Sequence, residues 1–275
     1  MPQATCGGVK GVGTPRARRQ FKYDYKYQRY YQLNHFNIAA RKAKSYERLE
    51  PLSRPRRFLL KKFNEKRPYK DMNYINQDAL SFGEQILEPT QKKRIYLEGY
   101  WQNENYFKDI EPIIRNDLRI ITPKDNDNIS AANKIKNCNA VGLHIRFFDD
   151  PQLVINSSRH VSYYNDAIAL MESKTENPHY FIFSDKPEMC KYILKIPSDK
   201  VTYIDHNYGD SMAHADMWLM SLCKHFIIAN STFSWWGAYF NDNKGKIVCY
   251  PSQWFGPKLA DKNTKDICPE EWVKL

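Results

Sequence analysis

The back half of the sequence alternates short apolar runs with helix-like segments, and this alternation constrains the fold more than any other feature. Four intervening segments, 161–174, 187–194, 211–223 and 232–240, read as helices, and Ser211 is a plausible N-cap of the third. Strands and helices that alternate in this way form parallel sheets covered on both faces. The sequence therefore predicts an α/β, Rossmann-like domain with strands at 140–146, 180–183, 200–204, 226–229 and 246–250.

The front half is less regular. Its patterns predict helices around 74–87 and 105–116 and a strand at 95–97. The polar, turn-rich segment 123–130 is the expected domain boundary. We therefore expect four parts: a disordered or atypical start (1–20), a front domain (21–130), a Rossmann-like back domain (131–255) and a C-terminal tail (256–275).

Charge is concentrated at the front of the chain, whose net charge is +11. Residues 1–70 contain 19 Lys or Arg and only 4 Asp or Glu. This surplus fits nucleic acid, an anionic membrane surface, an anionic substrate or simply a solvated basic face. No apolar stretch is long enough to span a membrane, and no signal peptide is evident at the start. The six cysteines form no C-x-x-C pair, which favours a reducing compartment.

Polar residues follow three of the predicted strands. Ligands bind parallel sheets at the carboxyl ends of the strands, where loops and helix N-termini converge. Those ends carry His144, Arg146, Asp149 and Asp150 on the first strand, Ser184 and Asp185 on the second, and Asn230, Ser231 and Thr232 on the fourth. The sequence therefore predicts one anion-binding edge built from all three ends.

Each of these residues has a plainer alternative. The free N–H groups after Ser231 suit a diphosphate, but Ser231 or Thr232 could merely cap a helix. Arg146 could clamp phosphate or pair with Asp149 or Asp150. His144 could contact a nucleotide or be a satisfied core histidine, and Asp185 could accept hydrogen bonds from a ligand or cap the helix at Pro187.

Asp216 and the two adjacent tryptophans could have structural roles. Asp216 lies in an apolar helix and needs a partner if it is buried. The adjacent Trp235 and Trp236 are expected to pack against the sheet rather than to form a sugar platform.

Together these residues resemble the three motifs of the α-1,2-fucosyltransferases of glycosyltransferase family eleven. The matching segments of the back half are His144–Asp149 (HIRFFD), Phe183–Asp185 (FSD) and the run from Asp216 to Ala238 that includes NSTFSWWGA. In the front half, Tyr96–Phe107 and Leu33–Ile38 are similar to segments of the same family.

The resemblance implies a GT-B-like fold of two Rossmann-like domains, of which the N-terminal one is incomplete here. It implies a metal-independent, inverting transfer of L-fucose from GDP-fucose to O2 of a terminal galactoside, with no cofactor. The front domain (21–130) would then face the acceptor and the back domain (131–255) would bind the GDP-sugar. We expect a cytoplasmic protein that contacts the inner face of a membrane peripherally and does not bind nucleic acid.

Carried over by position, the resemblance gives each residue a role. Arg146 would clamp the diphosphate and His144 would contact the nucleotide. The base or ribose would be held by Asp185 and Asp216, next to Ser184. Phosphate hydrogen bonds would come from Ser231 and Thr232, beside Asn230. For the general base, the candidates are Glu98, Asp149 and Glu104.

Two departures from the family pattern stand out. Phe147 and Phe148 replace an Arg-Gly pair, so a phosphate contact from the second arginine is lost. A Gly-Gly-x-Gly-Asn-Gln loop is absent from the start, where only Gly7-Gly8 resembles it. The alternatives to an active transferase are therefore a catalytically impaired protein that still binds nucleotide or glycan and a basic nucleic-acid-binding protein that uses residues 16–70.

Overall fold

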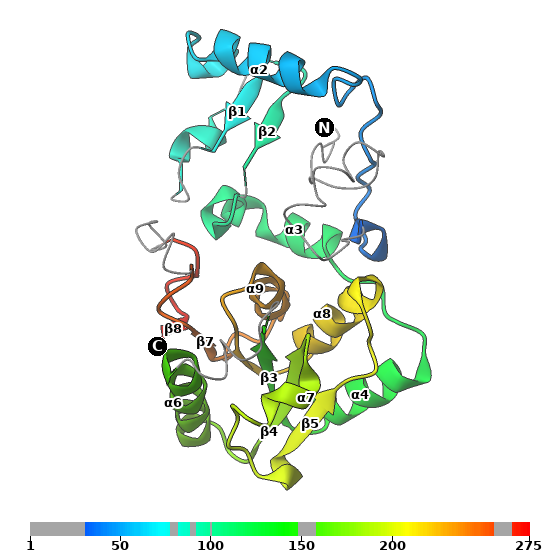
Figure 1. Ribbon diagram of the computed structural model, residues 1–275, viewed down its shortest axis with the longest axis vertical. Helices are drawn as coiled ribbons and strands as arrows, with labels where there is room; N and C mark the ends of the chain where they lie inside the picture. Colours follow the sequence, from blue (N-terminus) through cyan, green and yellow to red (C-terminus); the bar gives the residue numbers. More distant parts are fainter. Residues whose placement is uncertain (1–30, 78–81, 89–91, 100, 148–157, 256–265) are drawn as a thin grey trace. The chain divides into compact units, whose positions relative to one another are not determined.

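A computed structural model of the chain describes residues 31–77, 82–88, 92–99, 101–147, 158–255 and 266–275 (Figure 1). These residues divide into two compact units. Unit 1 comprises the described residues up to Leu118 and those from 266 to 268, and unit 2 comprises those from 119 to 255 and from 269 to 275. The predicted atypical start, 1–20, lies outside the described residues.

Unit 2 is built on a six-stranded sheet in which every neighbouring pair is parallel. The spatial order is β5-β4-β3-β6-β7-β8, so β3 lies in the interior of the sheet. The α/β fold class with parallel strands is confirmed. The strands are β3 (Asn139–Ile145), β4 (Pro178–Ser184), β5 (Val201–Ile204), β6 (His225–Ile227), β7 (Val248–Tyr250) and β8 (Val273–Lys274).

Helices cover both faces of this sheet. On one face, α6 and α7 pack against a cluster that includes Val141, Leu143 and Ile145. On the other face, α4 contacts β3 and α8 contacts β4, and α8 also packs against α4 and α9. Both faces of β3 are therefore buried, which is why its sequence is an almost continuous apolar run. The helices are α4 (Asn126–Lys136), α6 (Ser158–Lys174), α7 (Pro187–Cys190), α8 (Ala213–Ser221) and α9 (Thr232–Tyr239).

Two adjacent tyrosines of α6 hold the carboxyl ends of three strands. The hydroxyl of Tyr163 lies 2.6 Å from the carbonyl oxygen of Ile228 and 2.9 Å from that of Cys249, just after β6 and within β7. The Tyr164 hydroxyl donates to the carbonyl oxygen of His144 at 3.1 Å. Both side chains are buried. Helix α6 thereby fixes the edge of the sheet at which the predicted site lies.

Unit 1 contains a two-stranded parallel sheet formed by β1 (Tyr74–Asn76) and β2 (Tyr96–Glu98). The predicted strand at 95–97 is confirmed, but the predicted helix at 74–87 is wrong. Its first residues form β1 and its last form the 3₁₀ helix η3 (Glu84–Leu87). A short apolar run suits a strand or a helix equally well, and pairing with β2 decides between them here.

Helices and 3₁₀ turns make up the rest of unit 1. The helical segment expected at 105–116 is confirmed as two 3₁₀ turns followed by an α-helix. The elements are η1 (Leu33–His35), α2 (Ser53–Asn64), η2 (Tyr69–Asp71), η4 (Glu104–Tyr106), η5 (Lys108–Ile110) and α3 (Glu111–Asp117).

The boundary between the units differs from the expected one at 130. The polar segment 123–130 is mostly the first part of α4, because the Asp125 side chain accepts from the backbone N–H of Asn128 and caps the helix. Helix α4 packs on β3, so it belongs to unit 2 and the division falls at Leu118. The sequence did not distinguish the two, because residues with strong capping propensity occur both in loops and at the start of helices.

The C-terminal segment is also not a separate tail. Strand β8 pairs with β7 and extends the sheet to six strands instead of five. Asp266 belongs to unit 1, where its carboxylate accepts from the backbone N–H of Phe82 at 3.3 Å.

The cap of α8 and the state of the cysteines were also predicted from the sequence. Ser211 is not the N-cap of α8, because it lies inside the 3₁₀ helix η7 (Asp210–Met212) and Met212 occupies the cap position. The five cysteines that the structure describes are free thiols, as the lack of paired spacing suggests.

The tyrosine contact of α6 gives a stability test. Tyr163→Phe removes the donor to a buried carbonyl and should lower the free energy of unfolding by about 1–3 kcal/mol. Tyr208→Phe, at a side chain that is 78% exposed, is the matched control and should change it by less than about 0.5 kcal/mol. Urea unfolding curves measure both, and equal stability of the two variants would contradict the role given to Tyr163.

Candidate functional site

The carboxyl edge of β3 carries the residues with the clearest chemistry. His144 is the second-last residue of β3, and Arg146 follows the strand directly. Alternation along the strand puts these two side chains on the same face, opposite the one that α6 covers. Helix α9 lies on the face of His144, since the imidazole ring is 5.4 Å from the ring of Phe233. The end of β3 and the start of α9 are therefore adjacent.

Asp185, directly after β4, contacts the end of β3 in two ways. One carboxylate oxygen lies 3.5 Å from the Nε atom of Arg146, and the other accepts from the backbone N–H of Phe147 at 2.9 Å. The Arg146 and Asp185 side chains are 25% and 16% exposed, so the pair is largely shielded from solvent. Asp185 therefore restrains the guanidinium of Arg146.

This arrangement decides between two of the alternatives. Asp185 does not cap α7, because that helix begins at Pro187 without a side-chain cap. Ser184 acts locally, since its hydroxyl accepts from the backbone N–H of Lys186 at 3.1 Å and closes the turn after β4. Asp149 and Asp150, the other expected partners of Arg146, lie outside the described residues.

The N-terminus of α9 has the capping geometry expected from the sequence. Ser231 is the N-cap, and its hydroxyl accepts from the backbone N–H of Phe233 at 3.3 Å. The side-chain amide of Asn230 does not cap the helix and instead donates to the carbonyl oxygen of Trp254. Thr232 is the first helical residue and is exposed. Capping is thus confirmed for Ser231, and the positive end of the helix dipole lies beside His144.

His144 is buried but not fully hydrogen-bonded. Its side chain is 4% exposed, and its Nδ1 atom is a buried polar atom without a hydrogen-bond partner in the part of the chain that the structure describes. Burial, together with the nearby charge of Arg146, lowers the pKa of His144 to about 3. His144 is therefore a neutral imidazole at physiological pH. A buried polar atom without a partner is costly, which distinguishes this residue from a satisfied core histidine.

Asp216 of α8 belongs to a polar network that the sequence did not reveal. Its carboxylate accepts from the side-chain amide of Asn207 at 2.8 Å. Asn207 also exchanges two 2.9 Å hydrogen bonds with Asn128, which is fully buried in α4. His206 lies 3.1 Å from the same Asn128 amide oxygen, and Asp125 accepts from the Asn128 amide nitrogen. The network links α4 and α8 to the segment just beyond the end of β5.

Burial raises the pKa of Asp216 to about 7, although the hydrogen bond from Asn207 acts in the opposite direction. One feature of the sequence indicated this network, an Asp inside an apolar helix. No pattern indicated Asn128 or Asn207, because exposed asparagines are common in loops and at helix starts.

Glu98 is in unit 1, at the end of β2. Its carboxylate is 3.0 Å from the ammonium of Lys61 and accepts a short hydrogen bond from Tyr74. Partial burial raises the pKa of Glu98, but the hydrogen bonds from Tyr74 and Lys61 outweigh it and the pKa is lowered overall. Glu98 is therefore a weak base held in an ion pair.

Trp235 is part of a cluster of aromatic rings. It is 6% exposed and stacks on Tyr239, with ring centroids 4.9 Å apart, and it also lies 5.6 Å from Trp272. Trp236 stacks on Phe240 at 5.2 Å. Both indoles pack against other aromatic rings around α9, and the predicted packing against the sheet stays a prediction.

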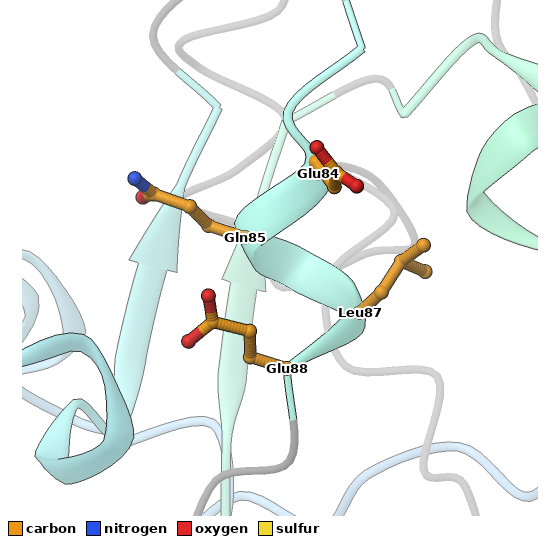
Figure 2. Close-up of a pocket in the computed structure, with 4 residues that line it drawn as sticks. All are labelled: Glu84, Gln85, Leu87 and Glu88. Carbon is orange, nitrogen blue, oxygen red and sulfur yellow. The ribbon is translucent and has the colours of Figure 1, made fainter.

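An open hollow of about 410 Å³ lies elsewhere, in unit 1 (Figure 2). It is lined by Glu84, Gln85, Leu87 and Glu88, the side chains of η3 and of the residue after it. All four are exposed. It contains none of the residues expected to take part in chemistry, and its acidic lining does not suit an anionic ligand.

Among the described residues, no group of three or more His, Cys, Asp or Glu side chains is arranged so that it could hold a metal ion. None of the helices described is both long enough and apolar enough to cross a membrane.

Comparison with known proteins places these residues in a family context. The model of "Glycosyl transferase family 11" matches residues 19–275. An alpha-1,2-colitosyltransferase from Escherichia coli is 37% identical over 199 residues, 69% of this chain and 65% of that protein. The O-antigen biosynthesis glycosyltransferase WbnK from Escherichia coli is 33% identical over 144 residues, 51% of this chain and 46% of that protein. The match thus spans between about half and two thirds of the length of these relatives.

A solved structure also matches in part. The crystal structure of fucosyltransferase NodZ from Bradyrhizobium has a TM-score of 0.37 and 14% sequence identity, with 55% of this chain and 53% of that chain covered.

The raised pKa of Asp216 gives a pH-dependent test. Between the unfolded pKa of 3.8 and the folded pKa of about 7, the folded chain binds more protons than the unfolded chain. Raising the pH through this window therefore lowers the free energy of unfolding. Asp216→Asn abolishes that dependence. Because the side chain is only partly buried, we expect the parent to lose about 1–2 kcal/mol relative to the variant between about pH 5 and about pH 8.

Urea unfolding at the two pH values measures this difference. Asp199→Asn, at an exposed aspartate, is the control and should follow the parent at both. A constant difference between parent and Asp216→Asn would show that Asp216 does not titrate in this range.

Proposed function

The chain belongs to glycosyl transferase family 11, and from this premise we propose that it transfers L-fucose from GDP-fucose to O2 of a terminal galactoside with inversion. The donor would bind to unit 2 at the carboxyl edge of the parallel sheet. One observation carries the proposal: Arg146, restrained by Asp185, follows the same strand end whose His144 contacts the first turn of α9. A permanent cation next to a helix N-terminus suits a diphosphate.

The chemistry of the leaving group explains why these residues matter. When the bond from the sugar to GDP breaks, negative charge grows on the β-phosphate. The guanidinium of Arg146 and the backbone N–H groups at the start of α9 would stabilise that charge. Asp185 would keep the guanidinium in place, so little reorganisation would be needed during the reaction. Ser231 and Thr232 would add phosphate hydrogen bonds from the same helix start.

The neutral His144 would contact the nucleotide through a hydrogen bond. Its Nδ1 atom gains no partner from the described protein, so a ligand group would relieve the cost of burying it. Because burial holds the pKa of His144 near 3, this contact would not change with pH in the physiological range.

Base or ribose recognition is assigned to Asp185 and Asp216. The carboxylate of Asp216 accepts a hydrogen bond from Asn207, which lies just beyond the end of β5. Strand β5 is two strands away from β3, and the two parallel strands end at the same carboxyl edge of the sheet. This spacing suits a nucleotide whose phosphates lie at β3 and whose base extends towards β5. Ser184 and Asn230 complete the expected set of donor-binding residues.

The acceptor hydroxyl needs a base to take its proton. The candidates remain Asp149, Glu98 and Glu104. Glu98 is the least suited of the described pair, because its ion pair with Lys61 lowers the basicity of the carboxylate.

A second candidate function differs only in the donor sugar. One relative is an alpha-1,2-colitosyltransferase at 37% identity. Colitose is L-fucose without the 3-hydroxyl group, so the same phosphate and nucleotide contacts would serve a GDP-colitose donor. A polar side chain that meets the 3-hydroxyl would favour fucose, because a buried polar group left unpaired rejects the deoxy analogue strongly.

Two alternatives to an active transferase make different predictions about binding. A catalytically impaired protein would still bind GDP, and a nucleic-acid-binding protein would use the basic front half instead. A cytoplasmic location with peripheral contact to the inner face of a membrane is part of the proposal, and nucleic acid is not.

Arg146→Ala tests the phosphate clamp. Removing a charged, hydrogen-bonded partner of a phosphate should weaken GDP binding about a hundredfold. Arg119→Ala removes an exposed arginine of unit 2 and should leave the affinity unchanged. Isothermal titration calorimetry with and without EDTA measures both effects, and EDTA should not abolish binding by the parent. If Arg146→Ala binds GDP as well as the parent, the clamp is assigned wrongly.

Turnover separates the candidate activities. We expect the chain to release GDP from GDP-fucose and lactose to accelerate this release, because lactose ends in a galactoside. The same assay with GDP-colitose compares the two donors. Tight GDP binding without lactose-stimulated release from either donor would identify the impaired protein instead.

A further inference from the structure

Helix α2 in unit 1 has an exposed apolar stripe. Leu52 at its N-cap, Leu59 and Phe63 are spaced by seven and four residues, so they lie in one row along the helix. They are 57%, 52% and 63% exposed, and Phe58, about 100° round the helix from Leu59, is 58% exposed. A row of large apolar side chains facing solvent on a single helix is unusual for a soluble surface and marks an interaction site.

The opposite face of α2 is fixed to unit 1. Asn64 is buried, its amide nitrogen donates to Asn73 at 2.9 Å, and its amide oxygen accepts from the backbone N–H of Asn73. Lys61 forms the ion pair with Glu98 of β2. Figure 1 shows α2 beside β1, which it contacts. The apolar stripe is therefore held outward by contacts on the other side of the helix.

Cations flank the stripe. Residues 52–67 contain seven Lys or Arg and a single acidic residue, Glu65. Arg54, Arg56, Lys62 and Lys66 are exposed. On the helical wheel, Arg56 and Lys62 lie on the two sides of the stripe, and Lys66 follows the end of the helix. A helix with exposed leucine and phenylalanine between lysines and arginines has the composition of helices that lie in the interface of an anionic membrane.

From these observations we infer that α2 is a docking surface for an anionic phospholipid bilayer. Leu52, Leu59 and Phe63 enter the boundary between headgroups and acyl chains, and the surrounding cations meet the lipid phosphates. Nucleic acid would satisfy the cations and could stack on Phe63, but it would leave Leu52 and Leu59 exposed, since leucine side chains cannot stack on bases. The inference gives a helix and a lipid class to the peripheral contact proposed above, and it does not depend on sugar transfer.

Vesicle flotation of the full chain tests this directly. The chain should float with vesicles of equal parts phosphatidylcholine and phosphatidylglycerol, should not float with phosphatidylcholine alone, and should be released by high salt. The double variant Leu59→Ser/Phe63→Ser should bind at least about tenfold more weakly. Its matched control, Ile113→Ser/Tyr192→Ser, removes two equally exposed apolar side chains outside α2 and should bind as the parent does.

A second pair of variants tests the contribution of the cations to membrane binding. Arg56→Gln/Lys62→Gln/Lys66→Gln should weaken binding about a hundredfold, since each cation near an anionic surface contributes roughly 1 kcal/mol. Lys136→Gln/Lys174→Gln/Lys195→Gln lowers the net charge equally with exposed lysines of unit 2 and should have a much smaller effect.

Far-UV circular dichroism and GDP affinity without vesicles show whether each variant is folded and keep this test separate from the donor site. A chain that floats but does not bind GDP would retain the docking surface and lose the donor proposal. The inference is overturned if the parent does not float, if the α2 variants float as well as their controls, or if the parent binds RNA instead of vesicles.

Discussion

The parallel pairing of β3 with β4 on one side and β6 on the other is the constraint on which unit 2 depends. It buries both faces of β3, so polar side chains can be used only near the end of the strand. It also sends the ends of β3, β4 and β6 to one edge of the sheet. The hydroxyls of Tyr163 and Tyr164 then fix that edge by binding carbonyl groups at or near three strand ends.

The candidate donor site combines rigid support with one unsatisfied group. Arg146 is restrained by Asp185, and Ser231 caps the helix whose first turn contacts His144. His144 is buried against Phe233, and its Nδ1 atom has no hydrogen-bond partner among the described residues. A site built this way can hold a charged ligand with little movement of the protein, which is the condition for electrostatic stabilisation of a leaving group.

The two units offer different kinds of surface. Unit 2 places its charged residues at the edge of a well-covered sheet, where they can act on a small anionic ligand. Unit 1 has only a short sheet among its described residues and leaves apolar side chains of α2 exposed between cations. Donor binding and membrane docking would thus use separate elements, so each can be removed by mutation without the other.

The sequence alone determined the parallel α/β class and most strands of unit 2, because alternating apolar runs and helical segments have few other solutions. It also placed His144, Arg146, Asp185 and Ser231 at strand ends. Tertiary structure decided the rest. Whether 74–87 became strand or helix depended on pairing with β2, and the network of Asn128, Asn207 and Asp216 joins residues up to 88 positions apart. Local patterns carry no information about such contacts, because they exist only once the elements have packed together.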